Sequence, residues 1–255
     1  MAPLRPGTRP HALAVVDALA AAYGPRPWRR HHPPVDELVT TVLSQSTTDA
    51  NQHRAFAALR EAFADGGWAA VREAPAEEVE RVVRPAGLAA QKAPRIQAIL
   101  RIVSEEPRGA DLEWLGSVPL EEAMEYLTAL PGVGPKTAAC VLCFSFDRPV
   151  LPVDTHVHRI ALRLGMVRPR TSAARTQAAL TRLVPAEDVY ATHMRLVAHG
   201  RTLCRPTGPR CPDCPLLALC REGRRRVRDP AGRAPPGPRP AASERESLRV
   251  RGGSV

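Results

Sequence analysis

The stretch LPGVGPKTA at residues 130–138 carries the clearest structural signal in this chain. Before it, apolar residues recur with the spacing of one helix face, at Leu120, Ala123, Met124 and Leu127. Gly132 and Gly134 accept backbone conformations that other residues resist, so they allow a tight turn with uncovered amide groups before a second helix. Such amides bind phosphate oxygens. The stretch predicts a helix–hairpin–helix that holds a DNA backbone without reading bases, with an ordinary helical hairpin as the alternative.

Lys136 follows this turn directly, and its chemistry differs from that of the other basic side chains. Of the 36 Lys and Arg residues in the chain, only Lys92 and Lys136 are lysines. An amine can lose its proton and attack an electrophilic carbon, whereas a guanidinium stays protonated. The positive end of the helix dipole is expected to lower the pKa of an amine at this position. We therefore predict that Lys136 is a nucleophile; a phosphate-binding lysine is the alternative.

Asp154 lies in the segment VDTH at residues 153–156, eighteen residues after Lys136. Its position before a helical stripe predicts the N-cap of a helix that begins at Thr155 and ends at Gly165. Capping does not exclude catalysis, because the same carboxylate can accept the proton of a lysine or face a developing positive charge. Asp154 is therefore a second candidate catalytic residue.

Four cysteines lie close together near the C-terminus, with the spacing C-x6-C-x2-C-x5-C: Cys204, Cys211, Cys214 and Cys220. A zinc ribbon usually needs two C-x2-C pairs, and only one is present here. Four thiolates in one loop are the usual ligands of a [4Fe–4S] cluster, which we predict; zinc and disulfides are the alternatives. Cys140 and Cys143 also form a C-x2-C pair, but they lie in an apolar helical segment and are predicted to be buried thiols.

The composition favours an all-α fold. Hydrophobic residues make up 44% of the chain but aromatic residues only 4%, so the core is mostly aliphatic. Ala, Leu and Arg favour helices, and alternating runs of β-branched residues are missing. Further helical stripes begin at Val35, Phe56, Ile96 and Val157. Asp49 is the predicted N-cap of the second of these.

The formal charge of +10 suggests a polyanionic partner, although it is unevenly placed. Residues 221–255 contain ten Arg and four acidic residues, which leaves a mildly basic remainder. No apolar run reaches the roughly 18 residues that span a membrane. The segment His11–Tyr23 has the spacing of an amphipathic helix rather than of a signal sequence. We expect a monomeric, cytoplasmic and nucleoid-associated protein.

With these residues assembled, the chain resembles the endonuclease III family of helix–hairpin–helix (HhH-GPD) DNA glycosylases. The resemblance runs from about His11 to Cys220. It is carried by LPGVGPKTA at 130–138, VDTH at 153–156, the four-cysteine spacing, and LSQSTTD at 43–49. Each motif alone is weaker evidence for the family than the four motifs together.

The resemblance implies two helical lobes with damaged duplex DNA between them. Residues 36–150 would form a six-helix barrel, 11–35 and 151–221 the iron–sulfur lobe, and 222–255 a disordered basic tail. In the implied reaction the damaged nucleotide, an oxidised pyrimidine in most of the family, is flipped out of the duplex. Lys136 attacks the sugar C1′, leaving a Schiff base, and β-elimination then cuts the strand at abasic sites; Asp154 is the implied catalytic carboxylate. A structural [4Fe–4S] cluster would hold Arg205 and Arg210 against phosphates.

Two departures from the family pattern concern DNA contacts. Ser46 stands where the family usually has a gap-filling Gln, and Gln45 lies beside it. Pro135 replaces a residue that is commonly basic. Two other functions are alternatives: a monofunctional adenine-type glycosylase, disfavoured because residues 39–43 contain no Glu, and a non-catalytic DNA-binding protein, which leaves the pair of Lys136 and Asp154 unexplained.

Overall fold

The computed structural model describes residues 4–229 of the chain. Within these residues all regular structure is helical, which confirms the expected all-α fold. The α-helices are α1 (Arg9–Tyr23), α2 (Pro34–Ser44), α3 (Asp49–Ala62), α4 (Gly67–Glu73), α5 (Ala76–Val83), α6 (Ala89–Ser104), α7 (Leu120–Ala129), α8 (Pro135–Phe146), α9 (Thr155–Leu164), α10 (Ala173–Leu183), α11 (Val189–Thr202) and α12 (Arg221–Arg228). The 3₁₀ helices are η1 (Arg84–Ala86), η2 (Glu113–Gly116), η3 (Ala186–Asp188), η4 (Cys211–Asp213) and η5 (Leu217–Leu219).

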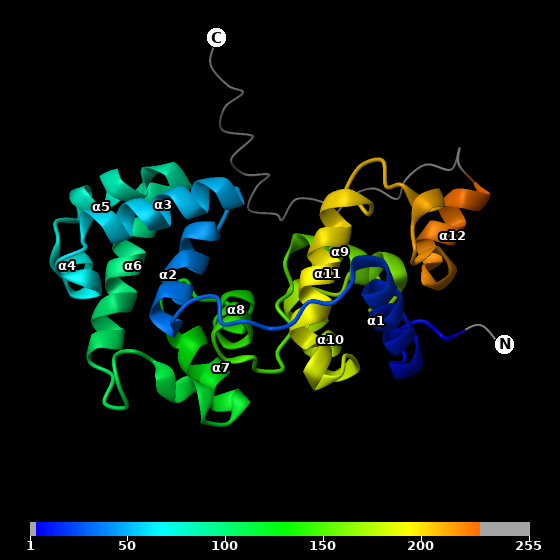
Figure 1. The fold of residues 1–255 in the computed structure, drawn as a ribbon, viewed down its shortest axis with the longest axis horizontal. Helices are drawn as coiled ribbons and strands as arrows, with labels where there is room; N and C mark the ends of the chain where they lie inside the picture. Colours follow the sequence, from blue (N-terminus) through cyan, green and yellow to red (C-terminus); the bar gives the residue numbers. More distant parts are fainter. Residues whose placement is uncertain (1–3, 230–255) are drawn as a thin grey trace, which may run out of the picture.

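The apolar side chains form two separate cores. The first joins helices α2 to α8, from Val35 to Val150. The second joins α1 to α9, α10 and α11 and to the cysteine-bearing segment, and it extends to Cys220. Figure 1 shows α2 to α8 on one side of the molecule and α1 with α9 to α12 on the other. The first helix of the chain therefore packs with the last ones, and not with its neighbour in sequence.

Helix α8 lies between the two cores and contributes to both. Its Leu142 belongs to the first core and its Cys143 to the second. The segment of residues 24–33, which leads from α1 to α2, runs along the end of α8 (Figure 1). There the N–H of His31 donates to the carbonyl of Phe144 at 3.1 Å. The position of α8 is thus fixed from both sides.

The turn before α8 depends on its first glycine. Gly132 has φ 70°, and a Cβ at this position would lie 2.3 Å from the Nε of Arg95. The backbone conformation is therefore strained for other residues, and a side chain here would also displace Arg95. Gly134 is the extended N-cap of α8, and Pro135 is the first helical residue, where its missing N–H costs nothing. The predicted hairpin between two helices is confirmed.

The ends of α9 and α3 test the helix caps predicted from the sequence. Asp154 caps α9 and Gly165 ends it with φ 79°, as predicted. The prediction for α3 is wrong by one residue, because Thr48 is the N-cap and its hydroxyl accepts from the N–H of Asn51 at 3.3 Å. Asp49 instead occupies the first turn, where its negative charge still faces the positive end of the helix dipole.

The predicted disordered tail, residues 222–255, is wrong at its beginning, because helix α12 continues the chain after Cys220. The N–H of Gly223 donates to the Cys220 sulfur at 3.2 Å, which caps the helix. Glu222 then pairs with two arginines one turn later on the same helix. Local capping and ion pairs outweigh the lack of apolar residues here. The remainder of the predicted tail, 230–255, lies outside the described residues.

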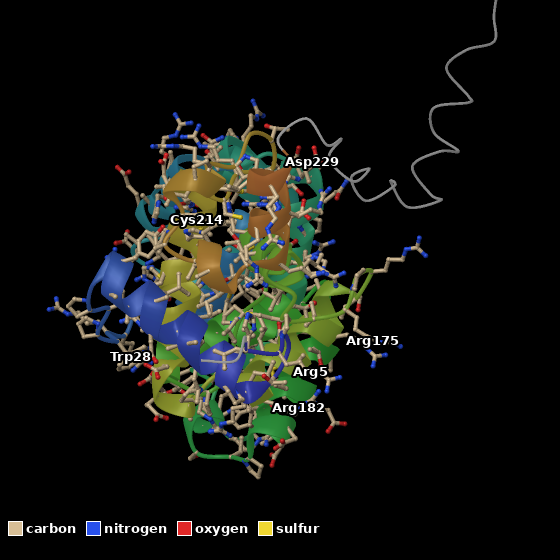
Figure 2. The ribbon with its side chains drawn as sticks, turned by 90° about the vertical axis from the view of Figure 1, so that its right-hand side faces the viewer. Arg5, Trp28, Arg175, Arg182, Cys214 and Asp229 are labelled. Atoms are coloured by element: carbon tan, nitrogen blue, oxygen red, sulfur yellow. The ribbon has the colours of Figure 1, made fainter. Side chains whose placement is uncertain are left out.

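Helix α1 packs against the cysteine-bearing end of the chain. Figure 2 shows α1, in blue, beside the orange segment near Cys214. The His11 ring is hydrogen-bonded to the Leu219 carbonyl at 3.0 Å, and the Tyr23 hydroxyl to the His199 ring at 2.7 Å. The predicted helix is confirmed, but its buried apolar face is Ala12, Val15, Val16 and Leu19, and Leu13 is exposed. No helix within the described part of the chain has the length and apolar character needed to cross a membrane.

Lys92, one of the two lysines, is a structural residue of the first core. It is only 1% exposed. Its ammonium donates to the carbonyl of Leu43 at 2.7 Å and to that of Ala86 at 2.8 Å. It thereby joins the end of α2, the η1 turn and α6.

We expect Lys92→Met to lower the free energy of unfolding by about 2–4 kcal/mol, because two buried carbonyl groups lose their donor. Urea unfolding followed by circular dichroism measures the change. Gln91→Ala, at an exposed position of the same helix, is the control and should stay within about 0.5 kcal/mol of the wild type. A Lys92→Met protein as stable as this control would contradict the assignment.

Candidate active site

A cleft of about 960 Å³ opens where the two cores meet. Its lining comes from the α2–α3 turn and from the starts of α8 and α9, with one residue near the end of α11. The lining residues are 44–50, 136–137, 153–156, His158, Ala173 and Arg201. The cleft therefore brings Lys136 and Asp154, predicted separately from two motifs, into one site.

Lys136 is the second residue of α8 and lines this cleft, where it is partly buried. Cys140, one turn further along α8, raises the pKa of Lys136 most, against the opposing effect of burial; Asp154 and Glu37 add to the increase. Burial raises the pKa of the Cys140 thiol in turn. The expected lowering of the Lys136 pKa is therefore wrong: the neighbouring side chains, Cys140 first and then Asp154 and Glu37, raise it.

Asp154 is held in place by its capping role. Its Oδ1 accepts from the N–H of Val157 at 2.7 Å, which fixes the carboxyl group at the start of α9. From there it contributes to the raised pKa of Lys136. The structure thus gives Asp154 both a structural bond and a position beside the lysine.

Glu37 is a member of this group that the sequence reasoning missed. It lies on α2 and is 4% exposed. Its Oε1 accepts from the Thr41 hydroxyl at 3.2 Å, while its Oε2 has no partner within the described residues. Burial raises the pKa of Glu37 to about 7, and Lys136 opposes this increase. The sequence alone does not place Glu37 near Lys136, because only the packing of α2 against α8 brings the two helices together. Glu37 lies two residues before residues 39–43, where an adenine-type glycosylase would carry its Glu.

The two candidate gap-filling residues, Gln45 and Ser46, differ in whether their side chains are hydrogen-bonded to the protein. Gln45 is tied to the hairpin, because its amide donates to the Gly132 carbonyl at 3.4 Å and its oxygen accepts from Arg95 at 3.0 Å. Ser46 is exposed and has φ 54°, a left-handed conformation that is uncommon for a serine. Within residues 4–229, the N–H groups of Gly132 and Gly134 have no protein acceptor and are available to a ligand.

Leu88 is a second residue that the sequence did not reveal. It precedes α6 with φ 51° and is 51% exposed, the most exposed large apolar side chain within the described residues. Its neighbourhood is anchored by Lys92, which bonds to the end of α2 just before Gln45. Strained positions of this kind gather at functional sites. An exposed leucine in a common tripeptide (Gly-Leu-Ala) gives no sequence signal.

The predicted arginine contacts lie elsewhere. Arg205 is exposed and bonds to the carbonyl of Thr202, and Arg210 pairs with Asp213 at 2.8 Å beside the cysteines. Neither lines the cleft. The arginine that does is Arg201, which the sequence reasoning missed. It pairs with Asp49 at 2.7 Å and so connects α11 to α3.

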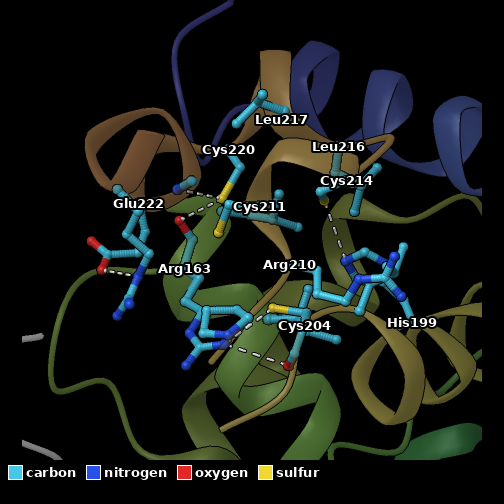
Figure 3. Close-up of a pocket in the computed structure, with 16 residues that line it drawn as sticks. Arg163, His199, Cys204, Arg210, Cys211, Cys214, Leu216, Leu217, Cys220 and Glu222 are labelled. Carbon is cyan, nitrogen blue, oxygen red and sulfur yellow. Dashed lines mark hydrogen bonds and ion pairs between the residues drawn. The ribbon is translucent and has the colours of Figure 1, made fainter. Parts of the chain in front are cut away.

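The four clustered cysteines line one cavity, as predicted from their spacing, and all six cysteines of the chain are free (Figure 3). Nitrogen groups approach three of the sulfur atoms. Arg163 donates to the Cys204 sulfur at 3.3 Å, the Gly223 N–H to Cys220 at 3.2 Å, and the His199 ring lies 3.7 Å from Cys214. Cys140 and Cys143 are 2% and 0% exposed in α8, as predicted.

The chemistry of these residues fits a [4Fe–4S] cube. Within residues 4–229, no three His, Cys, Asp or Glu side chains converge closely enough to hold one metal ion. The thiols instead surround a cavity, and in a cube each thiolate binds a different iron atom. The nitrogen groups beside the sulfur atoms are the contacts that support negatively charged ligands.

We expect Glu37→Gln to stabilise the protein at pH 8 but not at pH 4.5. The folded-state pKa of Glu37, about 7, exceeds the ordinary value of 4.5, so the protonated carboxyl favours folding. This contribution is complete below pH 4.5 and is lost as pH rises to about 7, up to roughly 3 kcal/mol. Gln cannot ionise and avoids the loss. Urea unfolding of both proteins at the two pH values measures it, and an equal difference at both would exclude a raised pKa.

Comparisons with known proteins agree with this geometry. Residues 39–186 match the family described as HhH-GPD superfamily base excision DNA repair protein. Endonuclease III of Bacillus subtilis is 38% identical over 197 residues, covering 77% of this chain and 84% of that protein. Endonuclease III of Thermotoga maritima is 40% identical over 201 residues, covering 77% and 88%.

A solved structure gives the same result in three dimensions. The structure of a trapped endonuclease III–DNA covalent intermediate superposes with a TM-score of 0.73 and 33% identity, covering 86% of this chain and 99% of that one. The sequence relatives and the structural match thus agree over most of both chains. The chain belongs to the HhH-GPD superfamily of base excision DNA repair proteins and, within it, to the endonuclease III family.

Proposed function

We propose that this protein removes damaged bases, chiefly oxidised pyrimidines, from duplex DNA and cuts the strand at the abasic site with Lys136 as its nucleophile. The protein is a base excision repair enzyme, a DNA glycosylase and abasic-site lyase. The observation that carries the assignment to residues is the shared cleft of Lys136 and Asp154, which two distant motifs bring together. One chain supplies both groups, so we propose that it acts as a monomer.

DNA binding is assigned to the two sides of the cleft. The free amides of Gly132 and Gly134, at the start of α8, suit a phosphate oxygen. Ser46 and Leu88 are exposed and held in left-handed conformations. The apolar side chain of Leu88 suits insertion into the base stack beside a flipped nucleotide. Gln45 would support the turn from beneath, because its side chain is already bonded to the hairpin.

The chemistry follows from Lys136. Its amine would attack C1′ of the extruded nucleotide, and the C1′–N bond electrons would leave with the base. The C1′–O4′ bond then opens, with O4′ taking the proton that the attacking nitrogen loses, and a Schiff base forms. This Schiff base makes the C2′ proton acidic, and its loss expels the 3′ phosphate. Asp154, fixed by the Val157 N–H, faces the positive charge that develops on the sugar.

The four cysteines Cys204, Cys211, Cys214 and Cys220 would hold a [4Fe–4S] cluster. When bound, the cluster cross-links the loop after α11 to α12 and serves as a structural centre. The neutral His199 ring, whose pKa burial lowers to about 4, suits this site: the Tyr23 hydroxyl can donate to one nitrogen while the other N–H faces Cys214. Arg205 and Arg210 flank this loop and are proposed phosphate contacts.

We propose that the two cores act as the two lobes of the family fold, with boundaries near residues 36 and 150. DNA would bind across the cleft between them. Helix α8 contributes to both cores, so the nucleophile would be carried by the element that joins the lobes.

Lys136→Arg keeps the positive charge and removes the nucleophile. With DNA containing an abasic site, we expect borohydride to trap a covalent adduct with the wild type and none with the variant. Both should bind a non-reactive abasic analogue with similar affinity. Lys92, the only other lysine, is buried and bonded to two carbonyls, so it cannot supply the adduct. Undiminished trapping by the variant would point to the N-terminal amine.

Replacing any one of the four cluster cysteines by Ala should give poorly soluble protein with less than stoichiometric iron, because the loop loses its central cross-link. Iron, zinc and sulfide analysis of anaerobically purified protein measures this. Cys143→Ala, in the core of α8, should retain its iron and serves as the control. Stoichiometric zinc without iron in the wild type would contradict the cluster.

A further inference from the structure

An ion pair joins the two walls of the active-site cleft, and the reaction above does not use it. Arg201, near the end of α11, pairs with Asp49, the first residue of α3, at 2.7 Å. Both residues line the cleft. Helix α3 belongs to the first core and α11 to the second, and Figure 1 shows them on opposite sides of the molecule.

This contact has no counterpart elsewhere between the two walls. Among the ion pairs of residues 4–229, it alone joins helices α2–α7 to helices α9–α12. The side chains of Arg201 and Asp49 are 53% and 62% exposed. An ion pair this exposed contributes little to folding stability. It can therefore open at small cost when another anion reaches the arginine.

The charges of the cleft lining show why an opening would matter. Apart from two histidines, the ionisable lining residues are Lys136 and Arg201, which are basic, and Asp49 and Asp154, which are acidic. While the pair is closed, these charges balance, although duplex DNA carries about one negative charge per 1.7 Å of its axis. Lys136 is the proposed nucleophile. Arg201 is thus the lining cation that remains for a phosphate.

Both partners of the pair tolerate its opening. Asp49 lies in the first turn of α3, where the positive end of the helix dipole stabilises its carboxylate after Arg201 has left. Its exposure also lets water replace the guanidinium. Arg201 has a long side chain whose planar guanidinium binds two oxygens of a phosphate as well as it binds a carboxylate.

We propose that Arg201 is a phosphate-binding residue that exchanges Asp49 for a phosphate of the bound strand as DNA enters the cleft. The inference rests on the proposed function, because it takes DNA to lie across the cleft. The free amides of Gly132 and Gly134 serve the strand from the start of α8. Arg201 adds a contact from the wall formed by the second core, where Arg205 and Arg210 do not reach the cleft.

The test is the salt dependence of affinity for duplex DNA that carries a non-reactive abasic analogue, from about 50 to 200 mM salt. Arg201→Gln should weaken binding about tenfold at the lowest salt, because a charged hydrogen-bond donor is lost. It should also flatten the slope of log affinity against log salt by about 0.9, the value of one phosphate contact.

The partner variant tests the exchange itself. Asp49→Asn should tighten binding about two- to fivefold without changing the slope, because Arg201 no longer has to leave an ion pair. In the Arg201→Gln background the same substitution should gain less, since it removes only the repulsion between Asp49 and the phosphates. The double-mutant comparison therefore separates competition for Arg201 from general charge repulsion.

Matched variants control for charge and for folding. Arg182→Gln and Asp17→Asn, at exposed positions of α10 and α1 that do not line the cleft, should keep the wild-type slope. Arg201→Lys keeps the positive charge and should also keep the slope. Circular dichroism checks each fold, and if Arg201→Gln does not fold, Asp49→Asn decides the question.

Equal slopes for the wild type and a folded Arg201→Gln would overturn the inference. So would a slope that falls equally in Arg201→Lys, because the loss would then not follow the charge. A slope about 0.9 steeper in Asp49→Asn would show that the wild-type pair stays closed on DNA, which also overturns it. These outcomes leave the proposed function intact. Absence of borohydride trapping by the wild type would instead contradict the proposed function itself.

Discussion

The structure depends on one constraint, which is that helix α8 must pack into two cores at once. Its middle packs with the barrel helices and its last turn with the helices of the other core, while the segment from α1 bonds to its end. A helix held on both sides cannot rotate to follow either core alone. The hairpin turn at Gly132, closed against Arg95, then fixes where it starts. Lys136 consequently occupies a defined place at the junction.

Burial around this lysine changes how its charge is controlled. A surface lysine at a helix start would feel mainly the backbone dipole, which disfavours its ammonium form. Lys136 instead lies among Cys140, Asp154 and Glu37, where removal of solvent strengthens every side-chain charge. The same removal of solvent disfavours the carboxylate of Glu37. One environment thus raises the pKa of both the amine and the acid.

The sequence was most informative where a function needs consecutive residues. The glycine turn, the cap at Asp154 and the cysteine spacing are local, and the structure places each of them as expected. The site residues that the sequence did not reveal are placed by contacts between distant segments. Glu37 meets Lys136 across 99 residues, and Arg201 reaches Asp49 across 152. The direction of the Lys136 pKa was wrong for a different reason, since the largest cause of the increase, Cys140, lies one turn further along the same helix. The helix after Cys220 was missed because its stability comes from a sulfur cap and ion pairs.

The packing of α1 against the far end of the chain has a consequence for biosynthesis. Tyr23 bonds to His199, and His11 to Leu219, so these two contacts of α1 cannot form until nearly the whole chain exists. At roughly 5–20 residues per second, the ribosome takes about 10–40 s to make the intervening segment. The barrel helices can collapse during that interval, because their core is complete at Val150. These contacts of α1 therefore form after the first core is complete, and the four cysteines that would hold the proposed cluster are made at the same late stage.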